Sequence, residues 1–253
     1  MEWKYYKQLF LNHSKMPYFN DKISQAKSII KNFPEKSKLD INNIYCTCST
    51  GKDSTVLTIL CNEIFPNIKV FSQKDNYDYP EELDYLKMLQ KKFNLNLDII
   101  KVHINLDEIN FFEEIHKRGT TLSDLYFYSI IDKYKKENNF KGVFLGLRNE
   151  ESKGRKLNNY KRGHTYQKKD GEWVCNPLYN WSGKDVFAYL LSNNIAPLKV
   201  YTLTKFCPPE KIRKSWFLPG ARTNKGACLI LKYYYPNLFK KLELVNQKIR
   251  LYI

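Results

Sequence analysis

A turn of small, hydroxylated and charged residues lies between a strand pattern and a helix pattern, and it has the composition of a phosphate-binding loop. The apolar segment 41–48 predicts a buried strand, and 54–65 has apolar residues at helical spacing. Backbone N–H groups of such a turn point at one spot, where the dipole of the following helix also favours an anion. A lysine charge and hydroxyl donors complete the candidate site, which consists of Ser49, Thr50, Gly51, Lys52, Asp53 and Ser54.

A second polar loop follows the apolar segment 140–147, which predicts another strand. Its two arginines, Arg148 and Arg155, have the planar group that holds an anion through two parallel hydrogen bonds. Its glutamate Glu151 is suited to orient an arginine or to bind a metal ion. A solvated charged loop has a similar composition, so this segment by itself leaves both interpretations open.

The segments around these loops alternate between strand and helix patterns. The alternation predicts an α/β fold, with a Rossmann-like parallel sheet flanked by helices. Ligands of such sheets lie at the carboxyl ends of the strands, where both polar loops are expected. Ser182 and Asp185 form a predicted capping box at the start of one helix. The remaining predicted strands and helices cover 68–72, 79–93, 97–102, 121–137 and 182–193.

The chain divides by its patterns into an N-terminal helical cover, a nucleotide-binding α/β domain and a basic, helical C-terminal region. In the first part, Pro34 is expected to end the helix. Within the second part, the basic segment 156–174 is predicted to be an arm or a hairpin, with Asp170 and Gly171 at its turn. Lysines and arginines interleaved with aromatic residues make this segment a candidate for nucleic-acid contact, although a lone basic stretch is more often a solvated loop. The three parts span 1–40, 41–201 and 202–253.

The composition favours anionic partners. The chain has 42 Lys and Arg against 26 Asp and Glu, which leaves a net charge of +16 and a field that attracts nucleotides and nucleic acids alike. No signal-like N-terminus and no run of about 18 apolar residues occurs. We therefore expect a cytoplasmic protein with no membrane partner. Its six cysteines are not expected to form disulfides in that compartment.

Taken in order, four segments resemble the PP-loop superfamily of ATP pyrophosphatases. The resemblance is to the branch with phosphoadenosine phosphosulfate (PAPS) reductases and the small subunit of bacterial ATP sulfurylase, and it implies an adenine nucleotide alpha hydrolase-like fold. Residues 49–54 resemble S-G-G-K-D-S with Thr50 in place of one glycine. Residues 79–85, 146–155 and 176–198 resemble Y-P-E-T-x-E-Y, G-x-R-x-x-E-S-x-x-R and P-L-x-x-W-x-x-x-D-V-W…I-P…P-L.

The resemblance implies ATP as the bound nucleotide. Members that cleave ATP between its α and β phosphates keep the K-D-S sequence, whereas reductases usually lose the lysine, and this chain keeps Lys52, Asp53 and Ser54. The loop is then expected to hold the β and γ phosphates together with Mg²⁺, for which Asp53 is the candidate ligand. The adenine is expected near Cys48 and Gln73.

The reaction implied by the resemblance is adenylyl transfer in sulfur-related or nucleic-acid-modification chemistry. An acceptor oxygen from sulfate, an amide or a nucleobase attacks the α-phosphorus, and pyrophosphate leaves. Lys52 and Asp53 are the expected catalytic residues of the loop. Arg148 and Arg155 are expected to stabilise the transition state, with Glu151 orienting them.

Two other functions remain open from the sequence. A PAPS reductase would use thioredoxin and a redox cysteine such as Cys228, although no E-C-G-L-H-like tail is present. A non-catalytic subunit would bind nucleotide or nucleic acid for a partner subunit. An iron–sulfur cluster is not expected, because Cys175, Cys207 and Cys228 form an incomplete, widely spaced set. Thr50 is a further open point, since a side chain in place of glycine narrows the loop or changes its backbone.

Overall fold

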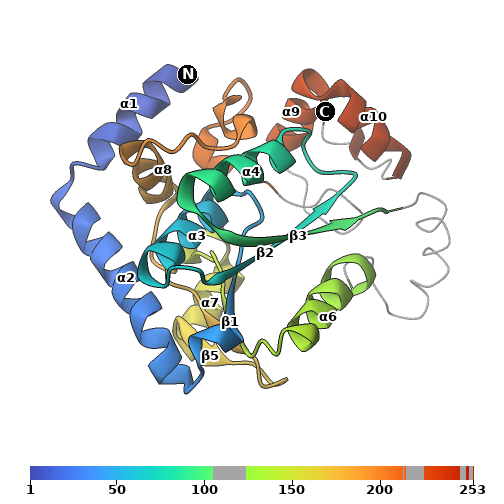
Figure 1. Ribbon diagram of the computed structural model, residues 1–253. Helices are drawn as coiled ribbons and strands as arrows, with labels where there is room; N and C mark the ends of the chain where they lie inside the picture. The colour runs from blue at the N-terminus through green and yellow to red at the C-terminus, as the bar shows by residue number, and fades with distance from the viewer. Residues whose placement is uncertain (105–123, 213, 215–224, 246–248, 251–252) are drawn as a thin grey trace.

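A six-stranded sheet runs through the molecule (Figure 1). The computed structural model describes residues 1–104, 124–212, 214, 225–245, 249–250 and 253. The strand order is β3-β2-β1-β4-β6-β5, and every neighbouring pair is parallel except β5 with β6. The predicted α/β fold with a Rossmann-like sheet is therefore confirmed. The strands are β1 (Ile44–Thr47), β2 (Lys69–Asp75), β3 (Asn96–Val102), β4 (Gly142–Phe144), β5 (Thr165–Gln167) and β6 (Trp173–Cys175).

Helices flank the sheet on both sides. Figure 1 shows α1 and α2 along one side of the molecule and α6 on the other. None of the described helices has the length and apolar character of a membrane span. The helices are α1 (Trp3–His13), α2 (Pro17–Ser37), α3 (Lys52–Ile64), α4 (Glu82–Phe93), α6 (Ser129–Glu137), α7 (Lys153–Arg162), α8 (Gly183–Ser192), α9 (Lys225–Tyr234) and α10 (Pro236–Val245).

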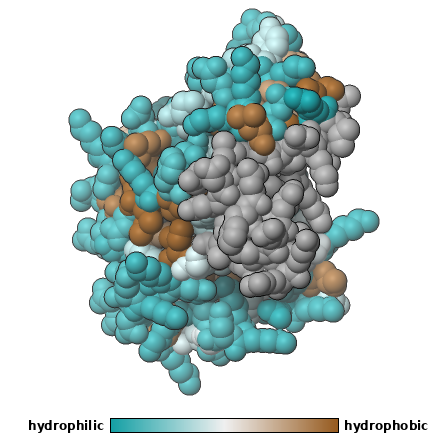
Figure 2. All heavy atoms as spheres, turned by 90° about the vertical axis from the view of Figure 1, so that its right-hand side faces the viewer, coloured by the Kyte–Doolittle hydropathy of each residue, from teal (hydrophilic) through white to brown (hydrophobic). Residues whose placement is uncertain are grey.

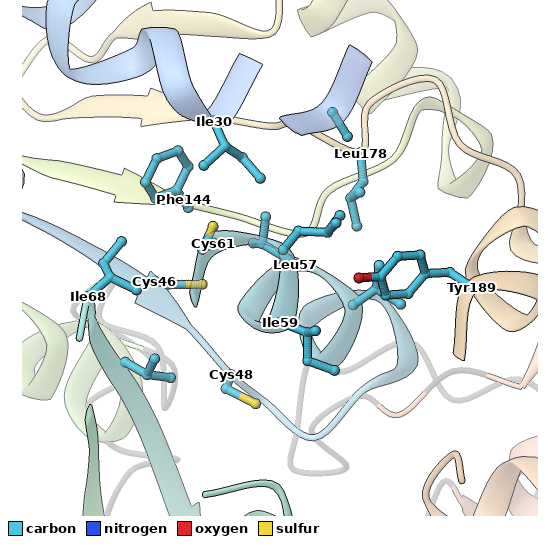
Figure 3. Close-up of a cluster of buried hydrophobic side chains, with 14 of the residues drawn as sticks. Ile30, Cys46, Cys48, Leu57, Ile59, Cys61, Ile68, Phe144, Leu178 and Tyr189 are labelled. Carbon is cyan, nitrogen blue, oxygen red and sulfur yellow. The ribbon is translucent and has the colours of Figure 1, made fainter. Parts of the chain in front are cut away.

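Side chains on the central strand alternate between two hydrophobic clusters. Cys46 of β1 packs in a cluster with α2 and α3, and Figure 3 shows Leu57 and Cys61 of α3 in it. The next residue back, Tyr45, lies in a separate cluster with Tyr134 of α6. Because successive side chains of a strand point to opposite faces, one short strand anchors the helices of both layers. The apolar sequence of the strand at 44–47 follows from burial on both faces.

A third hydrophobic cluster joins α1 and α8 to the C-terminal helices. Phe10 of α1 stacks on Phe187 of α8 with ring centroids 4.8 Å apart. Leu231 of α9 and Leu242 of α10 are fully buried in the same cluster. The face turned toward α6 and α10 is mostly hydrophilic where the residues are described, with separate hydrophobic patches (Figure 2).

The chain order creates a switch point between β1 and β4. From β1 the chain moves outward to β2 and β3, then returns to pair β4 with the opposite edge of β1. The loops after β1 and β4 therefore leave the sheet beside each other at its carboxyl edge. Ligands of open α/β sheets bind in the crevice formed at such a point.

The predicted end of the N-terminal helix was wrong. The helix expected to end at Pro34 continues to Ser37 as α2. A proline in the last turn removes only one helical hydrogen bond, and the hydroxyl of Ser37 donates to the carbonyl of Phe33 at 2.7 Å. The helix ends instead at Lys38, which has the left-handed conformation common at helix C-termini.

The basic segment 156–174 contains two different elements. Its first part belongs to α7, and its second part contains β5 and β6, which form an antiparallel hairpin with Gly171 at φ +88° in the turn. Since β6 pairs with β4, this hairpin is the edge of the main sheet.

Two other predicted regions also contain helices. The C-terminal region contains α9 and α10, and the predicted helix over 121–137 becomes a π-helical turn at Asp124–Tyr128 followed by α6. Residues 121–123 of that prediction lie outside the described part of the chain.

The capping box predicted at Ser182 and Asp185 is confirmed. The carboxylate of Asp185 also receives hydrogen bonds from Lys22 of α2, at 2.6 Å, and from His13 of α1, at 2.7 Å. It therefore holds three helices together. Burial raises the pKa of Asp185, but the donors from Lys22, His13 and Ser182 outweigh burial and hold it below the usual range.

We predict that Asp185→Asn lowers the free energy of unfolding by about 2 kcal/mol at pH 7, because the ammonium of Lys22 and the other hydrogen-bond donors lose a buried carboxylate. Urea unfolding measures this loss. The exposed Asp21 of α2 gives a matched control, since Asp21→Asn should change stability by less than about 0.5 kcal/mol. Because the pKa of Asp185 is lower in the folded state, its carboxylate stabilises the folded protein above about pH 4, and this stabilisation is lost as the pH falls. An equal deficit of Asp185→Asn at pH 7 and pH 3 would contradict the assignment.

Candidate functional site

The loop after β1 folds back on the start of α3 through its serines. The backbone N–H of Ser49 donates to the hydroxyl oxygen of Ser54 at 3.1 Å, and the two serine hydroxyls are 3.0 Å apart. Gly51 is the N-cap of α3, so the first N–H groups of a 13-residue helix border the loop. These donors and the positive end of the helix are the parts of an anion site.

The loop after β4 lies against the first turn of α3 because Gly146 has no side chain. A Cβ atom at Gly146 would come within 3.1 Å of the backbone of Asp53 and Ser54. This close approach places Arg148 beside Asp53, with Arg148 Nε 2.5 Å from Asp53 Oδ1. The two loops of the switch point are thus joined by a buried ion pair.

Asp53 lies between two cations. Its second oxygen, Oδ2, is 2.9 Å from Lys52 Nζ. Burial raises the pKa of Asp53, but the charges of Lys52 and Arg148 outweigh burial and hold it below the usual range. Lys52 is itself buried, with its ammonium 5.5 Å from the ring centroid of Tyr201, whose hydroxyl accepts the backbone N–H of Lys52 at 3.2 Å.

The remaining predicted catalytic residues form a second pair in the same loop. Glu151 accepts the backbone N–H of Arg148 at 3.0 Å and pairs with the guanidinium of Arg155 on α7. The neighbouring Glu150 pairs with Arg148 at 2.7 Å and accepts the N–H of Gly183 at 2.6 Å. Burial raises the pKa of Glu150, and these donors lower it below its ordinary value. Arg148 is therefore fixed from two sides.

These loops enclose a cavity of about 260 Å³ at the carboxyl edge of β1 and β4. Four of the five predicted catalytic residues line it, and the fifth, Arg148, lies behind Asp53. The charged groups of the lining are three cations and two carboxylates, so the cavity has a small positive excess. The lining includes Ser49, Gly51, Lys52, Asp53, Ser54, Glu151, Arg155, Tyr201 and Lys214.

Thr50 has the left-handed backbone conformation that glycine favours, with φ +61°. Its side chain is buried and points away from the cavity lining, and its hydroxyl donates to a carboxylate oxygen of Glu82 at 2.7 Å. The side chain in place of glycine thus leaves the loop open. A β-branched residue at positive φ is strained, and the hydrogen bond to Glu82 offsets that strain.

Glu82, at the start of α4, is a buried anion surrounded by donors. Besides accepting the hydroxyl of Thr50, its carboxylate pairs with the ammonium of Lys74 on β2 and with the ammonium of Lys214, which is 2.7 Å away. Lys214 also donates to the backbone carbonyl of Ser49 at 2.8 Å. Burial lowers the pKa of Lys214, but the carboxylates of Glu82 and Asp78 raise it above its usual value. A lysine distant in sequence therefore helps to fix the phosphate-loop backbone.

Sequence patterns missed Glu82, Lys74, Lys214 and Tyr201 as parts of the site. The segment 79–85 contained a signal for Glu82, since it resembles a family motif. Nothing local marked Lys214, which reaches the loop only through the tertiary fold. Its neighbours 213 and 215–224 lie outside the described residues.

Two residues predicted to contact the adenine do not line the cavity. Cys48 is 1% exposed within the hydrophobic cluster around α3, and burial raises the pKa of its thiol. Gln73, on β2, donates from its amide to the carbonyl of Tyr126. Neither residue belongs to the lining of the cavity, so their role in adenine binding stays a prediction.

All six cysteines lie within the described residues, and none lines the cavity. Cys175 and Cys228 are fully buried, whereas Cys207 is partly exposed. Burial raises the pKa of Cys207 and, to about 12, that of Cys175. Within the described residues, no group of three or more His, Cys, Asp or Glu side chains is arranged to hold a metal ion.

Comparison with known proteins finds relatives over most of the chain. The model of the phosphoadenosine phosphosulfate reductase domain matches residues 43–204. The chain belongs to this family. An uncharacterised protein of Methanocaldococcus jannaschii is 30% identical over 225 residues, which are 85% of this chain and 50% of that protein. The phosphoadenosine 5′-phosphosulfate reductase of Buchnera aphidicola is 29% identical over 161 residues, 60% of this chain and 63% of the reductase.

This member of the family thus spans about half to two thirds of the length of these relatives. Among solved structures, FMN adenylyltransferase of Candida glabrata, in complex with FAD and inorganic pyrophosphate, shares the fold. Its TM-score is 0.52 at 15% identity, and the match covers 79% of this chain and 67% of that one. The resemblance to PP-loop proteins is therefore confirmed for the fold and the family.

We predict that Glu82→Gln lowers the free energy of unfolding by about 3 kcal/mol, because Lys74 and Lys214 lose one of the two carboxylates that they share and are left with Asp78 alone. Chemical denaturation measures the loss. Asp84→Asn is the matched control, since Asp84 is exposed in the same helical turn and should cost less than about 1 kcal/mol. Thr50→Val, combined with Glu82→Gln in a double-mutant cycle, should show coupling above about 0.5 kcal/mol. Strictly additive effects of the two substitutions would contradict a stabilising interaction between Thr50 and Glu82.

Proposed function

We propose that this chain binds ATP in the cavity at the switch point and transfers the adenylyl group to an acceptor. The observation that carries the proposal is the phosphate loop, in which the start of α3 and the side chains of Lys52 and Ser54 face one cavity. Lys214 and Arg155 border the same space. A polyphosphate with several negative charges matches this convergence of donors and cations better than a neutral ligand does.

In the proposed reaction, the acceptor oxygen forms a bond to the α-phosphorus on the side opposite the leaving group. The bond from the α-phosphorus to its bridging oxygen breaks, and pyrophosphate leaves with the electron pair. Lys52 and the N–H groups of the loop stabilise the charge that develops on pyrophosphate, while Arg155 stabilises the α-phosphate oxygens. Asp53 holds Lys52 and Arg148 in place through its two carboxylate oxygens.

The residues present do not by themselves form a Mg²⁺ site. Both oxygens of Asp53, the predicted ligand, are already paired with cations, and Glu151 is paired with Arg155. Mg²⁺ bound with nucleotides takes many of its ligands from phosphates and water. We therefore assign Asp53 a positioning role and route no step through the metal.

Reduction of PAPS is the second candidate, because the Buchnera relative has the name of a PAPS reductase. That reaction needs a reactive thiolate close to the sulfonate. The buried Cys228 and the raised pKa of Cys207 are unfavourable for a thiolate nucleophile. The retained Lys52 likewise favours a nucleotide with a β-phosphate. Thioredoxin-dependent reduction of PAPS without ATP would support this candidate instead.

We predict that Lys52→Ala lowers the formation of AMP and pyrophosphate from labelled ATP by about 100-fold, since one preorganised cation is lost from the leaving group. The assay uses the protein alone and with sulfate, DNA or RNA as acceptor. Lys31→Ala is the control, because Lys31 is an exposed lysine of α2, and it should retain wild-type turnover. Turnover that survives in Lys52→Ala, or wild-type protein that releases no pyrophosphate under any of these conditions, would refute the proposal.

A further inference from the structure

A second pocket, of about 260 Å³, lies next to the phosphate cavity. It shares Leu147 and Arg155 with that cavity, so the two spaces have a common wall. The first turns of α7 form one side, and the segment after β6 forms the other. The backbone N–H of Asn149, in the turn before α7, donates to the carbonyl of Tyr179 at 2.8 Å and ties that turn to the segment after β6.

Asparagine side chains dominate this pocket, and two of them have unused hydrogen-bonding capacity. Asn149, Asn158, Asn159 and Asn176 all line it. Asn176 is only 6% exposed, and the carboxamide oxygens of Asn159 and Asn176 are buried without a hydrogen-bond partner. A buried acceptor without a donor costs about 1–3 kcal/mol. A ligand with N–H groups at its edge would remove that cost.

The charges at this pocket are already balanced by neighbours. Arg155 pairs with Glu151, and Arg148 pairs with Asp53 and Glu150. A neutral, planar group with both donors and acceptors matches the carboxamides directly, because a carboxamide donates through nitrogen and accepts through oxygen.

The surroundings of the pocket favour a base attached to a phosphate backbone. Tyr179 lines the pocket and supplies an aromatic wall, with its ring 5.2 Å from the ring of His164. Arg162 follows Asn158 by four positions, so it lies one turn further along the same face of α7. It is exposed over the ring of Tyr166, 5.3 Å from the centroid.

We propose that the second pocket binds a nucleobase, which Asn159 and Asn176 recognise through its hydrogen-bonding edge and Tyr179 through its face. Asparagine forms paired hydrogen bonds with base edges, and protein pockets read extruded bases by such bonds together with aromatic contacts. Arg162 contacts the phosphate of the strand that carries the base. The inference rests on the proposed adenylyl transfer, because it places the acceptor base beside Arg155 and the phosphate cavity.

Binding of labelled strands tests the inference without any turnover. The probes are fluorescent ten-nucleotide RNA and DNA homopolymers of each base, an abasic strand of the same length, and the free nucleoside monophosphates. Wild-type protein should bind at least one base-containing strand about tenfold more tightly than the abasic strand. Asn159→Leu and Asn176→Leu should each reduce that preference, whereas the exposed Asn32→Leu of α2 should preserve it.

Arg162→Ala should weaken the binding of abasic and base-containing strands equally and reduce its dependence on salt. If chemical denaturation shows wild-type stability for Asn159→Leu and Asn176→Leu, loss of base preference in these variants reports recognition and not collapse of the pocket. If a free nucleotide binds as tightly as the strand, the source of the base is a small molecule. If the strand binds more tightly than the free nucleotide, the source is nucleic acid.

Equal affinity of wild-type protein for abasic and base-containing strands would overturn the inference, as would a preference that survives in both asparagine variants. Base binding without pyrophosphate release would refute only the adenylyl transfer. Pyrophosphate release without base preference would refute only the base pocket.

Discussion

The ion pair between Asp53 and Arg148 joins the two loops on which the site depends. Asp53 belongs to the first turn of the helix after β1, and Arg148 to the loop after β4, so the pair closes the switch point of the sheet. Two features make the pair possible. Gly146 lets the loop after β4 contact the backbone at the start of α3, and Lys52 neutralises the rest of the Asp53 charge. Removal of either cation would leave this largely buried carboxylate with less compensation for its charge.

A second buried anion stabilises the phosphate loop from the opposite side. Glu82 binds the hydroxyl of Thr50 and the ammonium of Lys214, and Lys214 binds the carbonyl of Ser49. The left-handed backbone at Thr50 is thus maintained by a side chain of α4. A hydrogen bond offsets the strain that glycine, with its greater conformational freedom, would avoid at this position.

Much of the fold and part of the site could be predicted from the sequence. The strand–turn–helix order predicted the parallel sheet, because buried strands and amphipathic helices have different apolar periods. The capping box at Ser182 is a local hydrogen-bond pattern and was correct. The end of α2 was predicted wrongly, since Pro34 costs only one hydrogen bond in a last turn that Ser37 supports. The cavity near Lys52 was expected because both polar loops follow strands.

The sequence alone determined which residues lie at the carboxyl edge of the sheet, since strand ends and loop composition are local properties. It also determined the family, through ordered motifs around Lys52, Glu82 and Arg148. Only the tertiary structure decided how these charges are paired. It showed that Thr50 points toward Glu82, that Lys214 reaches the loop from the C-terminal region, and that Cys48 is enclosed in the core. Such pairings depend on contacts between segments 32 to 165 residues apart, and no local pattern encodes the distance between two such side chains.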